Sequence, residues 1–232
     1  MYFDTETRLL VVAAHPDDEI LGCGGTLARA RKKGAHVEVM FLSEGTSARF
    51  PFDEYDSQEY CTQVARRRKE AEEALNVLGI KEISFYQRLG CQFDTYPILS
   101  IVKDLESKIE SYSPTILFTH NPSEVNIDHC ITYKAVEAAC RPIYNWVPKE
   151  IYTFEVVCSG SWTFESSFKP NVFVDIDDVW DIKMKAWQCY KGETRPFPFP
   201  RSQMGQETLA QYRGISAGLK KAEAFCLVRK VI

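Results

Sequence analysis

LLVVAAHPDDE, residues 9–19, joins a run of apolar residues to a cluster of polar ones. An apolar run that ends abruptly on polar residues predicts a buried β-strand that stops at a working edge of a sheet. Pro16 fixes its own φ angle and disfavours a helical conformation for His15, so the chain must turn here. Apolar residues then recur at helical spacing from Leu21 onwards. The stretch therefore places an imidazole and three carboxylates where a strand gives way to a helix, the edge of an open α/β sheet at which ligands bind.

Strand-like and helix-like segments alternate along the rest of the chain. Residues 8–14, 37–42, 83–86, 115–119, 151–157, 172–176 and 225–231 are predicted strands, the last of them at a sheet edge. Residues 21–33, 57–78, 97–112, 127–139, 177–190 and 206–214 are predicted helices. This alternation predicts an α/β fold, a three-layer sandwich with a mostly parallel central sheet. With 232 residues, no long linker and no internal repeat, the chain is expected to form one domain, residues 1–232.

Composition and charge exclude several classes of protein. A net charge of −4 without a block of basic residues predicts no general attraction to nucleic acid. No apolar stretch has the length of a membrane span and the first residues lack a signal-peptide core, so we expect no stable membrane insertion. The eight cysteines include no CxxC pair. They predict reduced, mostly buried thiols in a cytoplasmic protein.

His15 and Asp18 lie three residues apart across the predicted turn, close enough to hold one divalent cation. Imidazole and carboxylate suit zinc, which needs a third protein ligand and an open position for water in a catalytic site. Asp17, between them, would be free to take a proton from that water. The structural alternative for the acidic residues is ordinary helix capping and interaction with the helix dipole.

The third ligand must come from a short list, because the chain has only four histidines. His36 opens a predicted strand at the opposite edge of the sheet and is expected at the surface. His120 ends another strand, and His129 lies in the first turn of the helix that follows it. Both are thus expected at the edge that carries His15. We favour His129 as the ligand and place His120 behind it or in the wall of the cleft.

The strings AHPDDE, residues 14–19, and NIDH, residues 126–129, make the sequence similar to the PIG-L/LmbE family of zinc-dependent de-N-acetylases. The resemblance extends nearly over the whole chain, to AEAF at residues 222–225. It implies a Rossmann-like fold and hydrolysis of an amide, usually the removal of acetyl from an N-acetylated amino sugar. It also implies that His15, Asp18 and His129 bind Zn²⁺ and that Asp17 is the general base.

Asn126 departs from the family pattern, since many members have a histidine at this position. That histidine is usually assigned to polarising the oxyanion or to giving a proton. Asn126 could donate a hydrogen bond to an oxyanion but cannot donate a proton at neutral pH. Its structural alternative is a plain helix N-cap.

Two predicted loops, residues 43–56 and 87–96, should line the mouth of the cleft. Arg49 and Asp94 are the polar residues there that are best suited to bind sugar hydroxyls, and His120 could form part of the wall. The resemblance supports this choice because an Arg and an Asp from similar loops contact the sugar in the family. The alternative for both is a solvated loop residue.

Three arginines and the expected partners complete the prediction of the site. Arg195, Arg201 and Arg213 could bind a phosphate or nucleotide moiety of the substrate. The expected partner is a small N-acetylated sugar or its conjugate, together with other copies of the chain in a homo-oligomer.

The sequence is also compatible with three other functions. Gly22-Cys23-Gly24-Gly25 could indicate a dinucleotide-binding turn, but the polar cluster occupies that turn, so we expect these glycines to allow close packing of the helix on the sheet. A catalytically silent binding protein is a second alternative. Within enzymes, an amidase that acts on a non-sugar amide or a thiol conjugate is the third.

Overall fold

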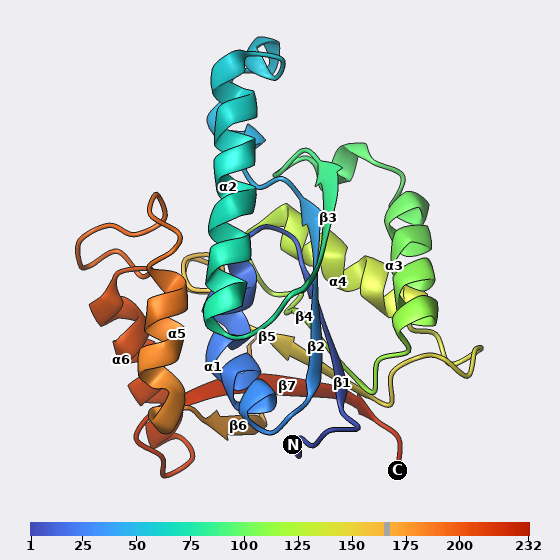
Figure 1. Cartoon of the computed structure of the whole chain (residues 1–232), viewed down its shortest axis with the longest axis vertical. Helices are drawn as coiled ribbons and strands as arrows, with labels where there is room; N and C mark the ends of the chain where they lie inside the picture. The colour runs from blue at the N-terminus through green and yellow to red at the C-terminus, as the bar shows by residue number, and fades with distance from the viewer. Residues whose placement is uncertain (165–167) are drawn as a thin grey trace.

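The computed structural model describes residues 1–164 and 168–232, which form a seven-stranded sheet between two layers of helices (Figure 1). The strands are β1 (Arg8–Ala13), β2 (His36–Ser43), β3 (Glu82–Arg88), β4 (Ile116–His120), β5 (Glu150–Phe154), β6 (Val172–Asp175) and β7 (Ala222–Lys230). Their order in the sheet is β3-β2-β1-β4-β5-β7-β6. The pairs among the first five are parallel, and β7 pairs antiparallel with both β5 and β6.

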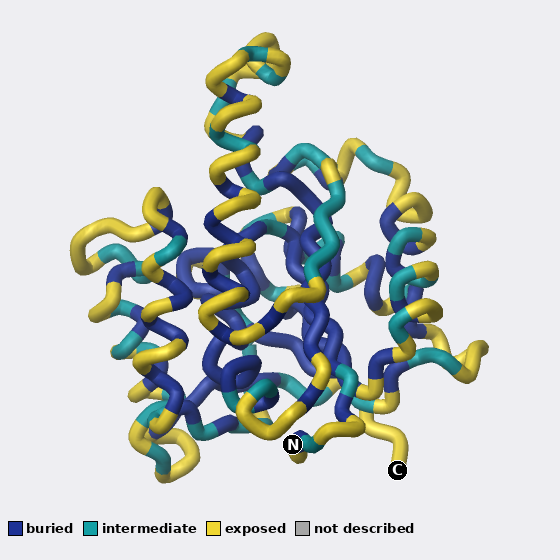
Figure 2. Tube along the Cα trace, in the orientation of Figure 1, coloured by how far each residue is buried: buried dark blue, intermediate teal, exposed yellow. Residues whose placement is uncertain are grey.

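Helices cover both faces of the sheet. They are α1 (Asp18–Lys32), α2 (Gln58–Val77), α3 (Ile98–Tyr112), α4 (Ile127–Ala139), α5 (Trp180–Trp187) and α6 (Gln203–Ile215). Short 3₁₀ turns are η1 (Ser47–Arg49), η2 (Phe52–Glu54), η3 (Phe93–Thr95) and η4 (Asp177–Val179). In Figure 1, α1, α2, α5 and α6 lie on one side of the sheet and α3 and α4 on the other. The first turns of α2 extend beyond the body of the molecule and are largely exposed (Figure 2).

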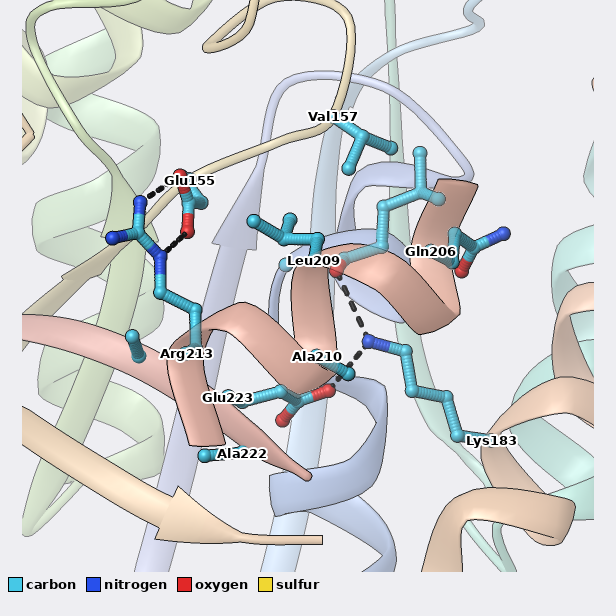
Figure 3. A pocket seen from close by; sticks show the side chains of 12 residues that line it. Glu155, Val157, Lys183, Gln206, Leu209, Ala210, Arg213, Ala222 and Glu223 are labelled. Carbon is cyan, nitrogen blue, oxygen red and sulfur yellow. Dashed lines mark hydrogen bonds and ion pairs between the residues drawn. The ribbon is translucent and has the colours of Figure 1, made fainter. Parts of the chain in front are cut away.

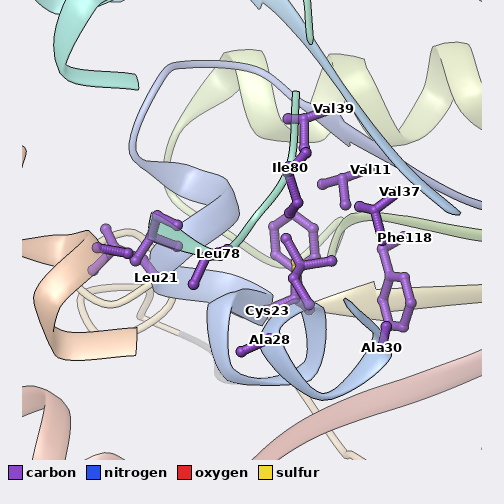
Figure 4. Close-up of a cluster of buried hydrophobic side chains, with 14 of the residues drawn as sticks. Val11, Leu21, Cys23, Ala28, Ala30, Val37, Val39, Leu78, Ile80 and Phe118 are labelled. Atoms are coloured by element: carbon purple, nitrogen blue, oxygen red, sulfur yellow. The ribbon is translucent and has the colours of Figure 1, made fainter. Parts of the chain in front are cut away.

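The alternation of side chains along β1 divides the core into two halves. Leu9, Val11 and Ala13 belong to the hydrophobic cluster beneath α1 and α2, part of which Figure 4 shows. Leu10 and Val12 belong to the cluster beneath α3 and α4. Successive side chains of a strand point to opposite faces, so a central parallel strand must be apolar throughout. This is why LLVV reads as one uninterrupted apolar run.

The predicted α/β sandwich with a mostly parallel sheet is confirmed, with corrections near the C-terminal end. The last strand was expected at an edge, but β7 lies between β5 and β6. The predicted strand 151–157 ends at Phe154, and the predicted helix 177–190 divides into η4 and α5. Local periodicity does not specify which strand pairs with which, and antiparallel insertion of β7 is decided by tertiary contacts.

The cysteines are all free, as expected, but most of them are not buried. Three are buried, Cys23, Cys140 and Cys158; the others are partly or fully exposed. No helix in the described ranges, 1–164 and 168–232, is long and apolar enough to cross a membrane.

The ion pair between Lys183 and Glu223 fixes α1 to the sheet through hydrogen bonds to the helix backbone (Figure 3). Glu223 of β7 accepts hydrogen bonds from the backbone amides of Gly25 and Thr26, at 2.8 and 2.7 Å. Lys183 of α5 donates to Glu223 at 2.7 Å and to the backbone carbonyl of Leu21 at 3.2 Å. Both charged side chains are buried, and each is satisfied by the other and by the helix backbone. The AEAF segment thus braces the helix that begins with the polar cluster.

The glycines of α1 allow the helix to approach the sheet closely, as expected from the sequence. A Cβ atom at Gly22 would lie 2.4 Å from the ring of Phe154, and one at Gly25 would lie 2.7 Å from Ile176. A side chain at either position would displace Phe154 or Ile176. These glycines lie inside the helix and not in the turn that precedes it, where a dinucleotide-binding motif needs them.

Replacing Gly22 by Ala should lower the free energy of unfolding by about 1–2 kcal/mol. Overpacking against Phe154 costs about 1–3 kcal/mol, which exceeds the gain in helix propensity of at most about 1 kcal/mol. Chemical denaturation measures the difference. Gly192→Ala is the control, because a Cβ there meets no atom within 4 Å. Equal stability of the two variants would contradict the close-packing argument.

Candidate active site

His15, Asp18 and His129 meet at the carboxyl edge of the sheet. His15 lies in the turn after β1, Asp18 is the first residue of α1, and His129 lies in the first turn of α4. His15 Nδ1 and His129 Nε2 each lie 3.3 Å from Asp18 Oδ2. The two ring nitrogens are also 3.3 Å from each other. Side chains separated by more than a hundred residues thus form a triangle of possible ligand atoms.

The spacing of these atoms fits a tetrahedral zinc site. Zinc bonds of about 2.1 Å in a tetrahedral arrangement place neighbouring ligand atoms about 3.4 Å apart. The second oxygen of Asp18, Oδ1, is buried and has no hydrogen-bond partner in the part of the chain that the structure describes. Two imidazoles and one carboxylate could therefore hold a divalent cation and leave a fourth position for water or substrate.

Two buried carboxylates orient the imidazoles. Asp128 Oδ2 lies 2.8 Å from His15 Nε2, and Glu124 contacts His129 Nδ1. When each carboxylate accepts the ring proton, the other ring nitrogen presents its lone pair to the centre of the triangle. Sequence reasoning missed both roles. Asp128 was noticed only as part of a motif, and Glu124 carries no local signal, because it lies in the loop before α4.

Asp128 is itself fixed by backbone amides. Its carboxylate accepts hydrogen bonds from the amides of Cys91 and Phe93, the latter at 3.0 Å. Cys91 adopts a positive φ of 57°, a conformation that L-residues rarely take. The loop after β3 is thus tied to the helix that carries His129.

His120 lies behind His129 and has no exposed surface. Its Nε2 accepts a hydrogen bond from the backbone amide of Ala14 at 2.9 Å. Its ring stacks on that of His129, with 3.9 Å between the ring centroids. This placement fits the expected supporting position and gives no surface for direct contact with a substrate.

The electrostatics of the cluster favour positive charge at its centre. Burial alone would lower the pKa of His129, but Asp18 and Glu124 raise it to about 9. Burial would raise the pKa of Asp18, yet the imidazoles of His129 and His120 hold it well below its usual range. Because metal ligands must bind in their deprotonated forms, a divalent cation would take the place of these imidazole protons.

Asp17 is held through its main chain and through its side chain. Its backbone has a positive φ of 123°, and its amide donates to Glu19 at 3.0 Å. Its carboxylate oxygen Oδ2 accepts a hydrogen bond from Arg201 at 2.8 Å. Burial raises the pKa of Asp17 to about 6, although Arg201 opposes this shift. A carboxylate with a pKa near neutrality suits both uptake and return of a proton.

Glu193 pairs with three arginines, two of which also lie near the carboxylate of Asp17. Its carboxylate pairs with Arg49 at 2.7 Å, with Arg201 at 2.8 Å and with Arg67 of α2. Arg67 Nη1 also lies 3.8 Å from Asp17 Oδ2. The arginines hold the pKa of Glu193 at about 2, although its burial would raise it. Sequence reasoning missed Glu193 and Arg67, since nothing local distinguishes either from a solvated charge.

The remaining predicted residues are not brought to the triangle of ligand atoms. Arg49 lies at Glu193 with its side chain 52% exposed. Asp94 is exposed on η3, next to the buried Phe93. Asn126 is the N-cap of α4, where its side chain accepts the amide of Asp128 at 2.9 Å. The structure thus shows the capping alternative for Asn126.

The arginines proposed for a substrate phosphate are largely engaged within the protein. Arg201 pairs with Asp17 and Glu193. Arg213 makes two hydrogen bonds to the carboxylate of Glu155, at 2.6 and 2.7 Å (Figure 3). This pairing weakens the expectation of a nucleotide-binding role for Arg201 and Arg213.

Known proteins are similar to this chain in sequence and in fold. Residues 10–140, more than half of the chain, match the model of a family described as PIG-L: GlcNAc-PI de-N-acetylase. A diacetylchitobiose deacetylase of Thermococcus kodakarensis is 26% identical over 97% of this chain and 85% of its own. A 1D-myo-inositol 2-acetamido-2-deoxy-alpha-D-glucopyranoside deacetylase of Catenulispora acidiphila is 31% identical over 75% of this chain and 65% of its own. An N,N'-diacetylchitobiose deacetylase from Pyrococcus horikoshii has a similar fold, with a TM-score of 0.77, 23% identity and coverage of 96% of this chain and 84% of its own.

Glu124→Gln should weaken zinc binding about 10–100-fold, because the amide no longer accepts the ring proton of His129 as a carboxylate does. Competition against a chelator of known affinity measures the change. Glu137→Gln, on the exposed face of α4, where Glu137 pairs with Lys134 at 3.0 Å, is the control and should bind zinc as the wild type does. Unchanged affinity in Glu124→Gln would remove Glu124 from the metal site.

Proposed function

Because this chain belongs to the PIG-L family of de-N-acetylases, we propose that it is a zinc-dependent hydrolase of an N-acetylated amino sugar or its conjugate. The reaction converts the N-acetyl group and water into a free amine and acetate. The single observation that carries the proposal is the 3.3 Å triangle of His15, Asp18 and His129. Asp17, the residue before Asp18 in the same turn, carries the carboxylate that we propose as the base.

His15, Asp18 and His129 would hold the zinc. When bound, zinc supplies a Lewis acid for the amide carbonyl and lowers the pKa of a water molecule to about 7. Glu124 and Asp128 keep the two imidazoles in the ligating orientation. Asp18 and His129 are buried, and the lower dielectric around them strengthens these interactions.

Asp17 acts first as base and then as acid. It takes a proton from the attacking water and delivers that proton to the amide nitrogen as the carbon–nitrogen bond breaks. We assign both steps to this one carboxyl group, because Asn126 cannot give a proton. Asn126 can donate a hydrogen bond to the developing oxyanion through its side-chain amide.

An N-acetylated sugar is the substrate class that the relatives support. The two deacetylases of Thermococcus kodakarensis and Catenulispora acidiphila are named for sugar substrates. Arg49 and Asp94, from the loops at the same edge of the sheet, remain the candidates for contacts with sugar hydroxyls. We place the enzyme in the cytoplasm, where its eight free thiols would stay reduced.

Acetate release from a panel of N-acetylated sugars, sugar nucleotides and glycan fragments tests the reaction. We expect acetate from at least one N-acetyl sugar, loss of that activity on treatment with a chelator, and recovery on addition of zinc. Hydrolysis of only non-sugar amides or thiol conjugates would replace the substrate class. A zinc-loaded protein without turnover on any member would mean a binding protein.

Asp17→Asn should reduce kcat by about 10²–10⁴-fold, the usual contribution of a general base, and should retain zinc. Metal analysis and acetate release on the same preparation separate these two effects. His129→Ala is the contrasting variant, since it should lose the metal itself. Near-normal turnover in Asp17→Asn would exclude Asp17 as the base.

Asn126→Asp distinguishes the two roles of Asn126. Aspartate caps a helix as well as asparagine does, so stability should change by less than about 0.5 kcal/mol. Aspartate has no N–H donor, so kcat should fall about 10²-fold if Asn126 stabilises the oxyanion. Thermal unfolding and acetate release are the two measurements, and unchanged kcat would leave Asn126 as a helix cap only.

A further inference from the structure

The loop between α5 and α6, residues 188–202, restrains Asp17 in two ways, once through Glu19 and once directly. Tyr190 donates a hydrogen bond to Glu19 Oε1 at 2.6 Å, and Glu19 Oε2 accepts the backbone amide of Asp17. Arg201 Nη1 donates at 2.8 Å both to Asp17 Oδ2 and to Glu193 Oε2. One loop therefore holds the main chain and the side chain of the same residue.

We propose that Arg201, fixed by Glu193, is a positioning residue that aims the carboxylate of Asp17 at the reacting water. The proposal rests on the function proposed above. It adds a role for a residue outside the three proposed metal ligands. Arg201 is not a substrate contact. It acts through Asp17.

The geometry of the contact leaves one carboxylate oxygen for chemistry. Arg201 Nη1 and Arg67 Nη1 both approach Oδ2 of Asp17, at 2.8 and 3.8 Å. Two cations on the same oxygen fix the rotation of the carboxyl group, because turning it would separate that oxygen from both. Oδ1 is then the oxygen that can exchange a proton with water.

Arg201 is restrained well enough to fix its partner. An arginine side chain loses much conformational freedom when it is held in one place, so an isolated surface pair orients little. Here the side chain of Arg201 is 18% exposed and that of Glu193 only 4%. Pro196, Pro198 and Pro200 precede Arg201 and stiffen the chain that carries it.

Asp17 needs such support because its backbone conformation is costly. A φ of 123° is unfavourable for a residue with a side chain and persists only where surrounding contacts impose it. The Tyr190–Glu19 hydrogen bond holds the amide, and the Glu193–Arg201 pair holds the carboxylate. The loop thus supplies the restraints that this position requires.

Arg201→Ala, assayed as the full-length zinc-loaded enzyme on the acetyl sugar found by the screen, tests the proposal. We expect kcat to fall about 10–100-fold with KM and zinc content close to those of the wild type, because a misaligned base slows the chemical step without weakening binding. Added guanidinium ion at millimolar concentration should restore several-fold of the lost kcat, since it can occupy the space between Asp17 and Glu193. Arg201→Lys keeps the charge but not the forked donors, so its kcat should lie between those of Arg201→Ala and the wild type.

Two controls separate positioning from a general loss of stability. Arg29→Ala removes an Arg–Asp ion pair, with Asp178 at 3.0 Å, from the far end of α1 and should keep wild-type kcat. Asp17→Asn should show no rescue by guanidinium, because the base itself is missing. If Arg201→Ala does not fold, Glu193→Gln releases the same arginine with a smaller change and takes its place in the assay.

A crystal structure of zinc-loaded Arg201→Ala gives a readout that is independent of turnover. We expect the Asp17 carboxylate to rotate away from its wild-type orientation while the three ligand side chains stay in place. The proposal is overturned if kcat of Arg201→Ala stays within about twofold of the wild type, if the loss is not rescued by guanidinium, or if Asp17 does not move. A wild-type enzyme that releases no acetate refutes the proposed function instead, and the orientation of Asp17 in the variant still decides the role of Arg201.

Discussion

The parallel pairing of β1 with β4 is the constraint on which the site depends. Leu9, Leu10 and Val11 pair with residues 116–118, so both strands end at the same edge of the sheet. From β1 the chain proceeds to β2 and β3 on one side, and β4 then lies on the other side. The turns that leave β1 and β4 therefore diverge at a topological switch point, the place at which open α/β sheets bind ligands. His15 follows the first strand to that point, and His129 follows the second.

Charge balance then determines which ligand these side chains can hold. Asp18, Glu124 and Asp128 surround the rings of His15 and His129, and all three carboxylates are buried. Buried carboxylates without compensating positive charge are costly, so the imidazoles must carry protons or share a cation. A divalent cation would satisfy the same carboxylates and imidazoles at once.

A second group of charges, of different composition, lies at Asp17. Glu193 and the arginines 49, 67 and 201 come from α2, from η1 and from the loop after α5. Adjacent residues of one turn thus face different surroundings: Asp18 faces imidazoles and Asp17 faces guanidinium groups. The abrupt change of direction at Pro16, with the positive φ at Asp17, makes this separation possible.

Much of this could be read from the sequence. The apolar run before His15 predicted the central strand, and the position of His129 in the first turn of a helix predicted its place at the same edge. The glycines of α1 predicted close packing, which the contacts with Phe154 and Ile176 confirm. These features succeed because each is local: a strand, a turn or a helix start is specified by residues that are neighbours in the chain.

The sequence by itself determined the alternation of strands and helices, the polar turn after β1 and the residue types that can bind zinc, because periodicity and residue chemistry are written along the chain. Only the tertiary structure decided that Glu124 and Asp128 orient the two imidazoles, that Glu193 and Arg201 hold Asp17, and that β7 lies inside the sheet. The contacts between Asp17 and Arg201, or between β5 and β7, join residues separated by many positions. Their partners are chosen by packing and by the need to satisfy buried charge, neither of which leaves a periodic signal in the sequence.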